Sequence, residues 1–201
     1  MAKKFWFFWA LALICSACGG GQVIEVDSGP PGRQGEPPAA PAPTLTGDKQ
    51  LLQEWANRSV VREEEVISLS NRMLQEDIAR GLDGESLALL EKALLKALPQ
   101  TGRGDSQALI QRNLGIVHFY KREYNKARQA LQSANETNPR DARTHFYLAC
   151  IYHQLAKQYQ QKGQVTKAKR AQNRAKIEIE TARRLEPGNP LYRKNPSILG
   201  D

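Results

Sequence analysis

The chain has 201 residues, with 29 basic and 21 acidic side chains, 40% hydrophobic residues and 25% charged residues. This length allows one domain plus accessory segments, since domains typically have about 100–200 residues. Three cysteines are too few for a disulfide framework of two or more bridges. No segment after the first eighteen residues approaches the ~18 apolar residues of a membrane-spanning helix, which excludes a multi-pass membrane protein.

The N-terminal residues have the layout of an export signal. Two lysines are followed by an eleven-residue apolar run, Phe5–Cys15, which is too short to span a bilayer and suits the hydrophobic region of a secretory signal. Small residues at positions 16 and 17 then precede Cys18. This layout resembles the signal of a bacterial lipoprotein, in which the cysteine is acylated and becomes the mature N-terminus.

The resemblance implies a lipoprotein signal peptide over residues 1–17 and a palmitate-type lipid on Cys18 that anchors the chain in a membrane. Gly19 follows the cysteine, and in Gram-negative lipoproteins this implies sorting to the outer membrane, with the chain facing the periplasm. An ordinary signal peptide cut after Ala17, or an uncleaved anchor, is the alternative interpretation.

Residues 18–47 are predicted to form a disordered tether behind the lipidated cysteine. The 29 residues of Gly19–Gly47 contain seven Gly and six Pro and few apolar side chains. Such a segment cannot bury enough apolar surface to offset the entropy lost on ordering. The tether would therefore let the rest of the chain move away from the membrane.

The chain after residue 47 has helical periodicity, and residues 106–189 contain a repeat. The 34 residues of Ala108–Asp141 place small, apolar and turn residues at regular spacings, namely Leu114, Gly115, Tyr124, Ala127, Leu131, Ala134 and Pro139. This pattern resembles a tetratricopeptide repeat, in which small residues let two antiparallel helices approach closely. The resemblance implies an all-α fold, a short solenoid of stacked helical hairpins.

A second, longer hairpin is predicted over Ala142–Glu186. Its first half restarts the repeat, but its second half matches only after an insertion of fourteen residues. Seven additional residues in each helix are the simplest account, because seven residues are close to two α-helical turns and leave the buried face unrotated. Gly163 marks the turn between the two helices.

Residues 48–105 are predicted to form N-terminal helices, with Asp83 as an N-cap and Pro99 as a stop signal. They form either a degenerate first repeat or a capping hairpin without repeat ancestry. In both cases about three hairpins stack, which is the usual minimum for a solenoid. The tail after Pro187, including residues 190–201, is expected to be largely non-helical.

The repeat resemblance also implies a partner-binding groove, because the first helix of each hairpin lines the concave face in this family. The positions that usually contact ligands are Leu109, Arg112, Ile116, Phe119 and Tyr120 in one repeat, and Arg143, Phe146, Cys150, His153 and Gln154 in the next. An apolar groove with arginine anchors suits a helical or extended peptide. The alternative is that the long hairpin or the N-terminal helix covers this face and makes it part of the core.

Positive charge is concentrated in the long hairpin. Ala142–Ile177 carries eight basic residues and no acidic residue, whereas Asp48–Asp105 carries eleven acidic and eight basic residues. The predicted basic patch comprises Lys157, Lys162, Lys167, Lys169, Arg170, Arg174 and Lys176. It favours an anionic partner, and the export signal makes an acidic protein, an anionic envelope polymer or a lipid headgroup the expected ligand rather than nucleic acid. A solvated helix face is the alternative.

The sequence shows no constellation for catalysis, cofactor binding or metal binding. The three histidines do not form a metal motif, and Cys150 is expected to be a small buried side chain rather than a nucleophile. The sequence therefore predicts a non-enzymatic, membrane-anchored adaptor that binds envelope proteins through the groove, in assembly of a pilus, secretion, outer-membrane or wall-synthesis complex. The alternative function is binding of an anionic polymer or lipid through the basic hairpin.

Overall fold

The computed structural model describes residues 45–102 and 104–193, which belong to one unit of the chain, residues 43–201. In chain order its elements are α1 (Leu45–Asn57), α2 (Glu63–Met73), α3 (Glu76–Ala79), α4 (Gly84–Ala97), the 3₁₀ turn η1 (Leu98–Gln100), α5 (Asp105–Tyr120), α6 (Tyr124–Thr137), α7 (Ala142–Gln161), α8 (Val165–Leu185) and α9 (Pro190–Arg193). No strand occurs in the described residues, which confirms the predicted all-α class. The predicted signal peptide, Cys18 and almost all of the predicted tether lie outside these residues.

Local sequence signals determine where several helices begin and end. The carboxylate of Asp83 accepts a hydrogen bond from the backbone N–H of Ser86 at 2.6 Å and caps the N-terminus of α4, as predicted. Asp141 caps α7 in a similar way through the N–H of Arg143 at 3.2 Å. Helix α4 ends before Pro99, which lies in η1, because proline cannot continue the α-helical hydrogen bonds.

The turns that connect α5 to α6 and α7 to α8 have the same length, backbone conformation and hydrogen bond. Each pair is joined by three residues, and the middle residue has a left-handed backbone, with φ of 61° at Arg122 and 68° at Gly163. In both turns the next residue donates its N–H to a helix carbonyl five residues earlier, at 2.9 Å in the first hairpin and 2.8 Å in the second. Glycine adopts this conformation without steric cost, so the turn predicted at Gly163 is confirmed and has a physical reason.

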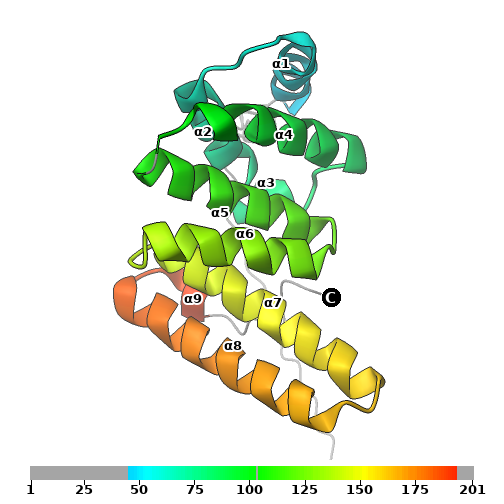
Figure 1. Cartoon of the computed structure of the whole chain (residues 1–201), viewed down its shortest axis with the longest axis vertical. Helices are drawn as coiled ribbons and strands as arrows, with labels where there is room; N and C mark the ends of the chain where they lie inside the picture. The colour runs from blue at the N-terminus through cyan, green and yellow to red at the C-terminus, as the bar shows by residue number, and fades with distance from the viewer. Residues whose placement is uncertain (1–44, 103, 194–201) are drawn as a thin grey trace, which may run out of the picture. The chain divides into compact units, whose positions relative to one another are not determined.

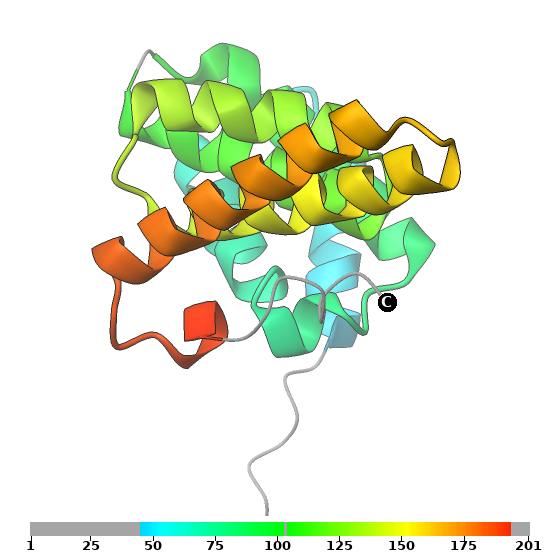
Figure 2. The same ribbon diagram turned by 90° about the horizontal axis from the view of Figure 1, so that it is seen from below.

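The second hairpin is longer than the first, as its insertion predicts. Helices α7 and α8 have 20 and 21 residues, compared with 16 in α5 and 14 in α6. One buried stripe runs along α8 and consists of alanines and a single isoleucine, namely Ala168, Ala171, Ala175, Ile179 and Ala182. Helices α7 and α8 lie side by side at one end of the stack, and the turn that joins them extends beyond the ends of α5 and α6 (Figures 1 and 2).

The N-terminal helices do not repeat this hairpin geometry. Helices α2 and α4 both pack on α5, but ten residues that include α3 separate them, where the later hairpins have three-residue turns. Helix α4 lies between α1 and α5 (Figure 1), and α1 contributes Leu52 and Trp55 to the core. This part of the chain therefore lacks the tight turn that the two later hairpins share.

The C-terminal tail is more ordered than expected. Residues Pro190–Arg193 form the one-turn helix α9, and Tyr192 is only 3% exposed. The side-chain oxygen of Asn189 accepts a hydrogen bond from the N–H two residues on at 3.0 Å, and the proline stands at the first helical position, which its fixed φ favours. The Nε of Arg183 also donates to the carbonyl of Tyr192 at 2.7 Å. The prediction of a non-helical tail is wrong for these four residues, and residues 194–201 lie outside the described part.

Gly115 allows the close contact between α5 and α6. A Cβ atom at this position would lie 2.5 Å from Cγ of Leu131 and 3.1 Å from the carbonyl oxygen of Ala127. We expect Gly115→Ala to lower the free energy of unfolding by about 1–3 kcal/mol, because the methyl group overfills this contact. Urea denaturation followed by circular dichroism measures the loss. Gly84→Ala is the control, since nothing lies within 4 Å of its added Cβ, and an equal loss in both variants would contradict this account.

Candidate functional site

The predicted groove residues are not exposed in the structure. Four of them are buried, namely Arg112, Ile116, Phe119 and Phe146, and four are partly buried, namely Leu109, Tyr120, Arg143 and His153. Cys150 and Gln154, which complete the predicted set, are buried as well. The first helices of both hairpins therefore direct these side chains toward other parts of the chain.

Two arginines of the predicted groove bind the chain's own N-terminal helices. The guanidinium of Arg112 donates to the side-chain oxygen of Asn71 in α2 at 2.6 Å and to the carboxylate of Asp141 at 3.3 Å. Arg143 donates to the backbone carbonyl of Leu74, the residue directly after α2. The groups expected to anchor a partner peptide are therefore already satisfied from within the chain.

Aromatic side chains fill the remaining space on this face. Between ring centroids, Phe119 lies 5.5 Å from Tyr147, and Phe146 lies 5.2 Å from Tyr192 of α9. Burial raises the pKa of the Tyr147 hydroxyl above its ordinary value. Of the two interpretations that the sequence leaves open, the core interpretation holds for Ile116, Phe119 and Phe146. An open groove at these positions is corrected, because neighbouring helices pack against this face.

We expect Phe146→Ala to destabilise the fold. Removing this fully buried ring leaves a cavity beside Tyr192, so the free energy of unfolding should fall by about 3–5 kcal/mol. Thermal unfolding of the full chain measures the change. In the control Val165→Ala, at a side chain that is 73% exposed, the change should stay below about 0.5 kcal/mol. A Phe146→Ala chain as stable as the parent would refute the core assignment.

The Cys150 thiol and the cluster of Glu91, His118 and Glu123 could in principle react or bind a metal, but both contact other parts of the chain. Cys150 is fully buried, and burial raises the pKa of its thiol, which confirms the prediction of a small buried side chain. Glu91, His118 and Glu123 present possible metal-ligand atoms within 4.8 Å of one another. The ammonium of Lys121 contacts both carboxylates and already supplies a positive charge between them. This cluster therefore acts as an ion-pair network that joins α4 to the α5–α6 turn.

His145 joins three segments of the chain. Its Nδ1 lies 2.7 Å from the carboxylate of Glu178 in α8, and its Nε2 lies 3.0 Å from the carbonyl oxygen of Pro139. Both neighbours are acceptors, so both ring nitrogens can donate only when the imidazole is protonated. The hydrogen bond to Glu178 accordingly raises the pKa of His145 above its ordinary value of 6.5.

Because folding raises this pKa, the protonated His145 stabilises the fold fully below the unfolded value, and the contribution is lost as the pH rises through the folded value. We expect the Tm to fall as the pH rises above the ordinary histidine pKa of 6.5, and to fall less in Glu178→Gln, which removes the main cause of the raised pKa. Differential scanning calorimetry measures both slopes. Glu180→Gln, at an exposed position on the same helix, is the control. Equal slopes in the parent and in Glu178→Gln would contradict the assignment.

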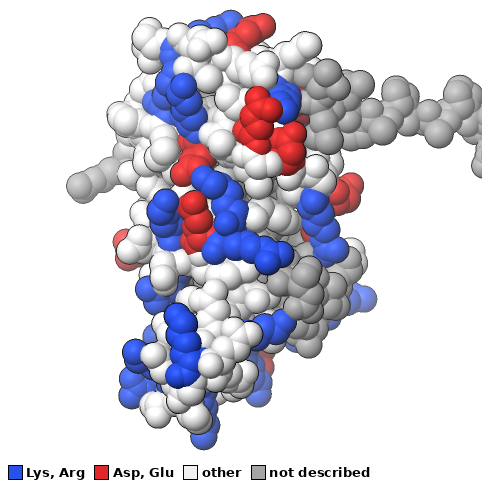
Figure 3. Space-filling model, turned by 90° about the vertical axis from the view of Figure 1, so that its right-hand side faces the viewer, with Lys and Arg blue, Asp and Glu red and all other residues white. Residues whose placement is uncertain are grey.

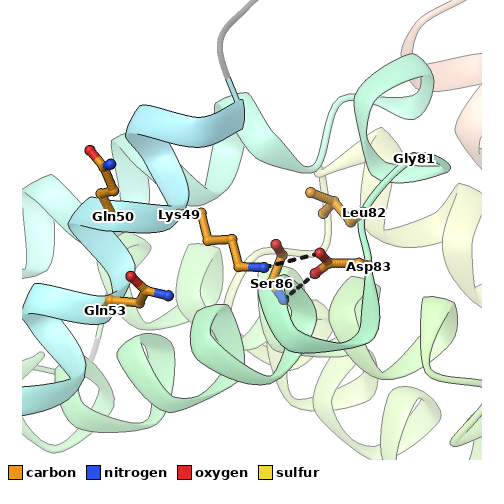
Figure 4. Close-up of a pocket in the computed structure, with 7 residues that line it drawn as sticks. All are labelled: Lys49, Gln50, Gln53, Gly81, Leu82, Asp83 and Ser86. Atoms are coloured by element: carbon orange, nitrogen blue, oxygen red, sulfur yellow. Dashed lines mark hydrogen bonds and ion pairs between the residues drawn. The ribbon is translucent and has the colours of Figure 1, made fainter.

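A pocket of about 350 Å³ lies between α1 and the start of α4 (Figure 4). Its lining residues are Lys49, Gln50, Gln53, Gly81, Leu82, Asp83 and Ser86. The ammonium of Lys49 reaches across it to the carboxylates of Asp83 at 3.1 Å and Glu85 at 2.6 Å. The backbone N–H of Ser86, together with Lys49, lowers the pKa of Asp83 to about 2. The charges of this pocket are thus paired, and they hold α1 on α4.

Six of the seven residues of the predicted basic patch are, in contrast, exposed. Lys157 is partly buried, and the other six residues are exposed, namely Lys162, Lys167, Lys169, Arg170, Arg174 and Lys176. None of these six forms an ion pair with a described residue, whereas acidic side chains of α1, α2, α3 and α4 pair with nearby bases. Figure 3 shows the contrast, with red and blue mixed over the upper part of the surface and blue prevailing over the lower part.

A second hollow lies within this patch, where α8 and the distal part of α7 meet the start of α6. It has a volume of about 270 Å³. Its lining residues come from these three helices and are Arg128, Tyr152, Leu155, Tyr159, Lys167, Arg170, Ala171 and Arg174. Four of the eight are cations and none is acidic. We call this hollow the basic pocket.

The basic pocket combines an aromatic wall with an unused hydrogen-bond donor. The Nε of Arg128 is buried and has no hydrogen-bond partner among the described residues. The ammonium of Lys167 lies 5.9 Å from the ring centroid of Tyr159, within cation–π range. Arg128, Tyr152 and Tyr159 are not among the predicted site residues. The available signal is the spacing of Tyr152, Leu155 and Tyr159 by three and four residues, which places all three on one face of α7.

No family model, curated protein or solved structure matches the chain. None of the helices between residues 45 and 193 combines the length and the apolar character that crossing a lipid bilayer requires.

Proposed function

We propose that the chain is a membrane-tethered adaptor that binds an acidic partner protein through the exposed basic surface of the α7–α8 hairpin. One observation carries the proposal: the six exposed cations of the basic patch, which lie between Lys162 and Lys176, have no ion-pair partner among the described residues. Unpaired surface charge of one sign attracts a partner of the opposite sign and accelerates association.

The rest of the proposal comes from the sequence pattern. The export signal and Cys18 support a lipid-anchored position in a bacterial envelope, at the outer membrane in a Gram-negative cell. The repeat pattern of residues 108–141, the close contact at Gly115 and the shared turn geometry support a tetratricopeptide-like body. The proposed binding surface differs from the concave face implied by that resemblance, because this face is filled by the chain itself.

A binding role is favoured over catalysis because the candidate reactive groups are engaged internally. Cys150 is inaccessible, and His145 bonds to Glu178 and to a backbone carbonyl. Nucleophilic and acid–base catalysis need such groups within reach of a substrate. The described residues therefore support recognition as the proposed activity.

Binding of an anionic envelope polymer or lipid is the second candidate function. The unpaired cations of α8 follow one another from Lys167 to Lys176, which spans about 14 Å at 1.5 Å per residue. Such a row suits the repeated negative charges of a polymer. In that case the number of cations, and not their position, would determine affinity.

A photo-crosslinking residue at Gln172, exposed on α8, tests the proposal in the full chain in its native host. It should capture an acidic protein that mass spectrometry identifies. Capture should fall at least about tenfold when four hairpin bases are replaced by Gln, because the attracting charge is lost. These four are Lys167, Lys169, Arg170 and Arg174.

The control replaces four exposed bases outside the basic patch by Gln and changes the net charge equally. They are Lys92, Arg122, Arg140 and Arg184, the last at the opposite end of α8 from the distal turn. Capture should persist in this control. Equal capture by the parent and both variants would refute the proposal, and capture of glycan or lipid instead of protein would establish the second candidate.

A further inference from the structure

The basic pocket has the features of a recognition site for an acidic peptide. We propose that Arg128, Arg170 and Arg174 bind carboxylates of an extended acidic segment of the partner, and that an apolar side chain of the same segment packs against Tyr152 and Tyr159. This inference rests on the proposed function and specifies where on the hairpin the partner is recognised.

The pocket exists because the second hairpin is longer than the first. Tyr159 lies in the last turn of α7, and Lys167 lies in the first turn of α8. Arg128 belongs to the beginning of α6, which these extended helix ends pass. These distal helix ends are the additional length of the second hairpin, and without them Tyr159 and Lys167 would be missing from the lining. The insertion is therefore the feature that builds the site.

The lining of the pocket selects an anion. Its cations are Arg128, Lys167, Arg170 and Arg174, and none of them pairs with an acidic side chain of the described residues. Three of the four are arginines, whose planar forks match the two oxygens of a carboxylate. The buried Nε of Arg128 adds a donor that the fold leaves unused. A bound carboxylate would satisfy this donor and neutralise the surrounding charge.

The other side chains of the pocket favour a peptide over a membrane surface. Tyr152, Leu155 and Tyr159 place an aromatic and apolar wall next to the arginines, an arrangement typical of protein recognition sites. At about 270 Å³ the hollow accommodates individual side chains, since small-molecule pockets start at roughly 300 Å³. The turn at residues 162–164 carries no apolar side chain that could insert into a bilayer. The surface therefore fits an acidic segment with interspersed apolar residues.

Fluorescence anisotropy with the full chain in mild detergent tests the inference. The probe is a short fluorescein-labelled peptide of alternating Glu and Leu. The double variant Arg170→Gln/Arg174→Gln should raise its Kd at least about tenfold, because it removes two carboxylate forks. The matched variant Lys169→Gln/Lys176→Gln removes the same charge from the same helix outside the pocket and should raise Kd less than about twofold.

Two further measurements address the individual subsites. Tyr159→Ala should weaken binding of the Glu–Leu peptide more than binding of a Glu–Ser peptide, because only leucine uses the aromatic wall. A Gln–Leu peptide should not bind. All four substituted bases are exposed, so circular dichroism should show unchanged helicity in both double variants.

Three results would contradict binding of an acidic peptide in the basic pocket. Equal weakening by both double variants would overturn the pocket while leaving the basic hairpin as the binding surface. Displacement of the labelled peptide by inorganic phosphate at lower concentration than by unlabelled peptide would assign the pocket to phosphate groups and overturn the peptide proposal. Failure of the parent chain to bind the peptide would also overturn it, and the crosslinking experiment would still decide the proposed function.

Discussion

The burial of Arg112 constrains how the helices of this chain can be arranged. A guanidinium stays charged, and withdrawing it from water is costly unless hydrogen bonds replace its hydration. Its partners, Asn71 and Asp141, belong to α2 and to the segment before α7, so both segments must lie against α5. Asn113 extends the network to Ser70 at 2.7 Å. Polar contacts thus hold the N-terminal helices in place, and these helices close the face that the repeat resemblance implies to be open.

Because that face is closed, the exposed groups that could bind a partner lie instead on the α7–α8 hairpin, at the other end of the helical stack. Side chains implied by the resemblance as ligand contacts, such as Phe119 and Phe146, serve the core instead. Residues 161–167, at the distal end of the long hairpin, are all exposed, and the exposed cations of α8 from Lys167 to Lys176 form no ion pair with a described residue. The longer hairpin therefore separates two tasks: its proximal part completes the core, and its distal part supplies surface.

The sequence was sufficient for features that depend on nearby residues. The N-cap at Asp83, the turn at Gly163 and the alanine stripe of α8 follow from local spacing, and the structure contains all three. The sequence left open whether the groove is covered and could not decide it, because closure joins distant residues and uses a backbone carbonyl, that of Leu74, which has no sequence signature. Arg112 was expected to contact a ligand because of its position in the repeat, and arginine is rarely buried, so nothing in the sequence indicated its place in the core. Without the packing of α6 on α7, Arg128 could not be connected to the basic patch.

Because its buried stripe consists mainly of alanines, the distal part of α8 is held on α7 by less buried apolar area than the rest of the core. Alanine methyl groups allow a close approach of α8 to α7 but bury little apolar area, and near the beginning of α8 only Ala168 and Ala171 are buried. Detaching the first turns of α8 is therefore expected to cost less than unfolding the whole body, and we expect amide hydrogens there to exchange through local opening. A ligand that bridges α6, α7 and α8 opposes this opening by mass action. Occupancy of the basic pocket and helical order at the hairpin end are thereby thermodynamically linked.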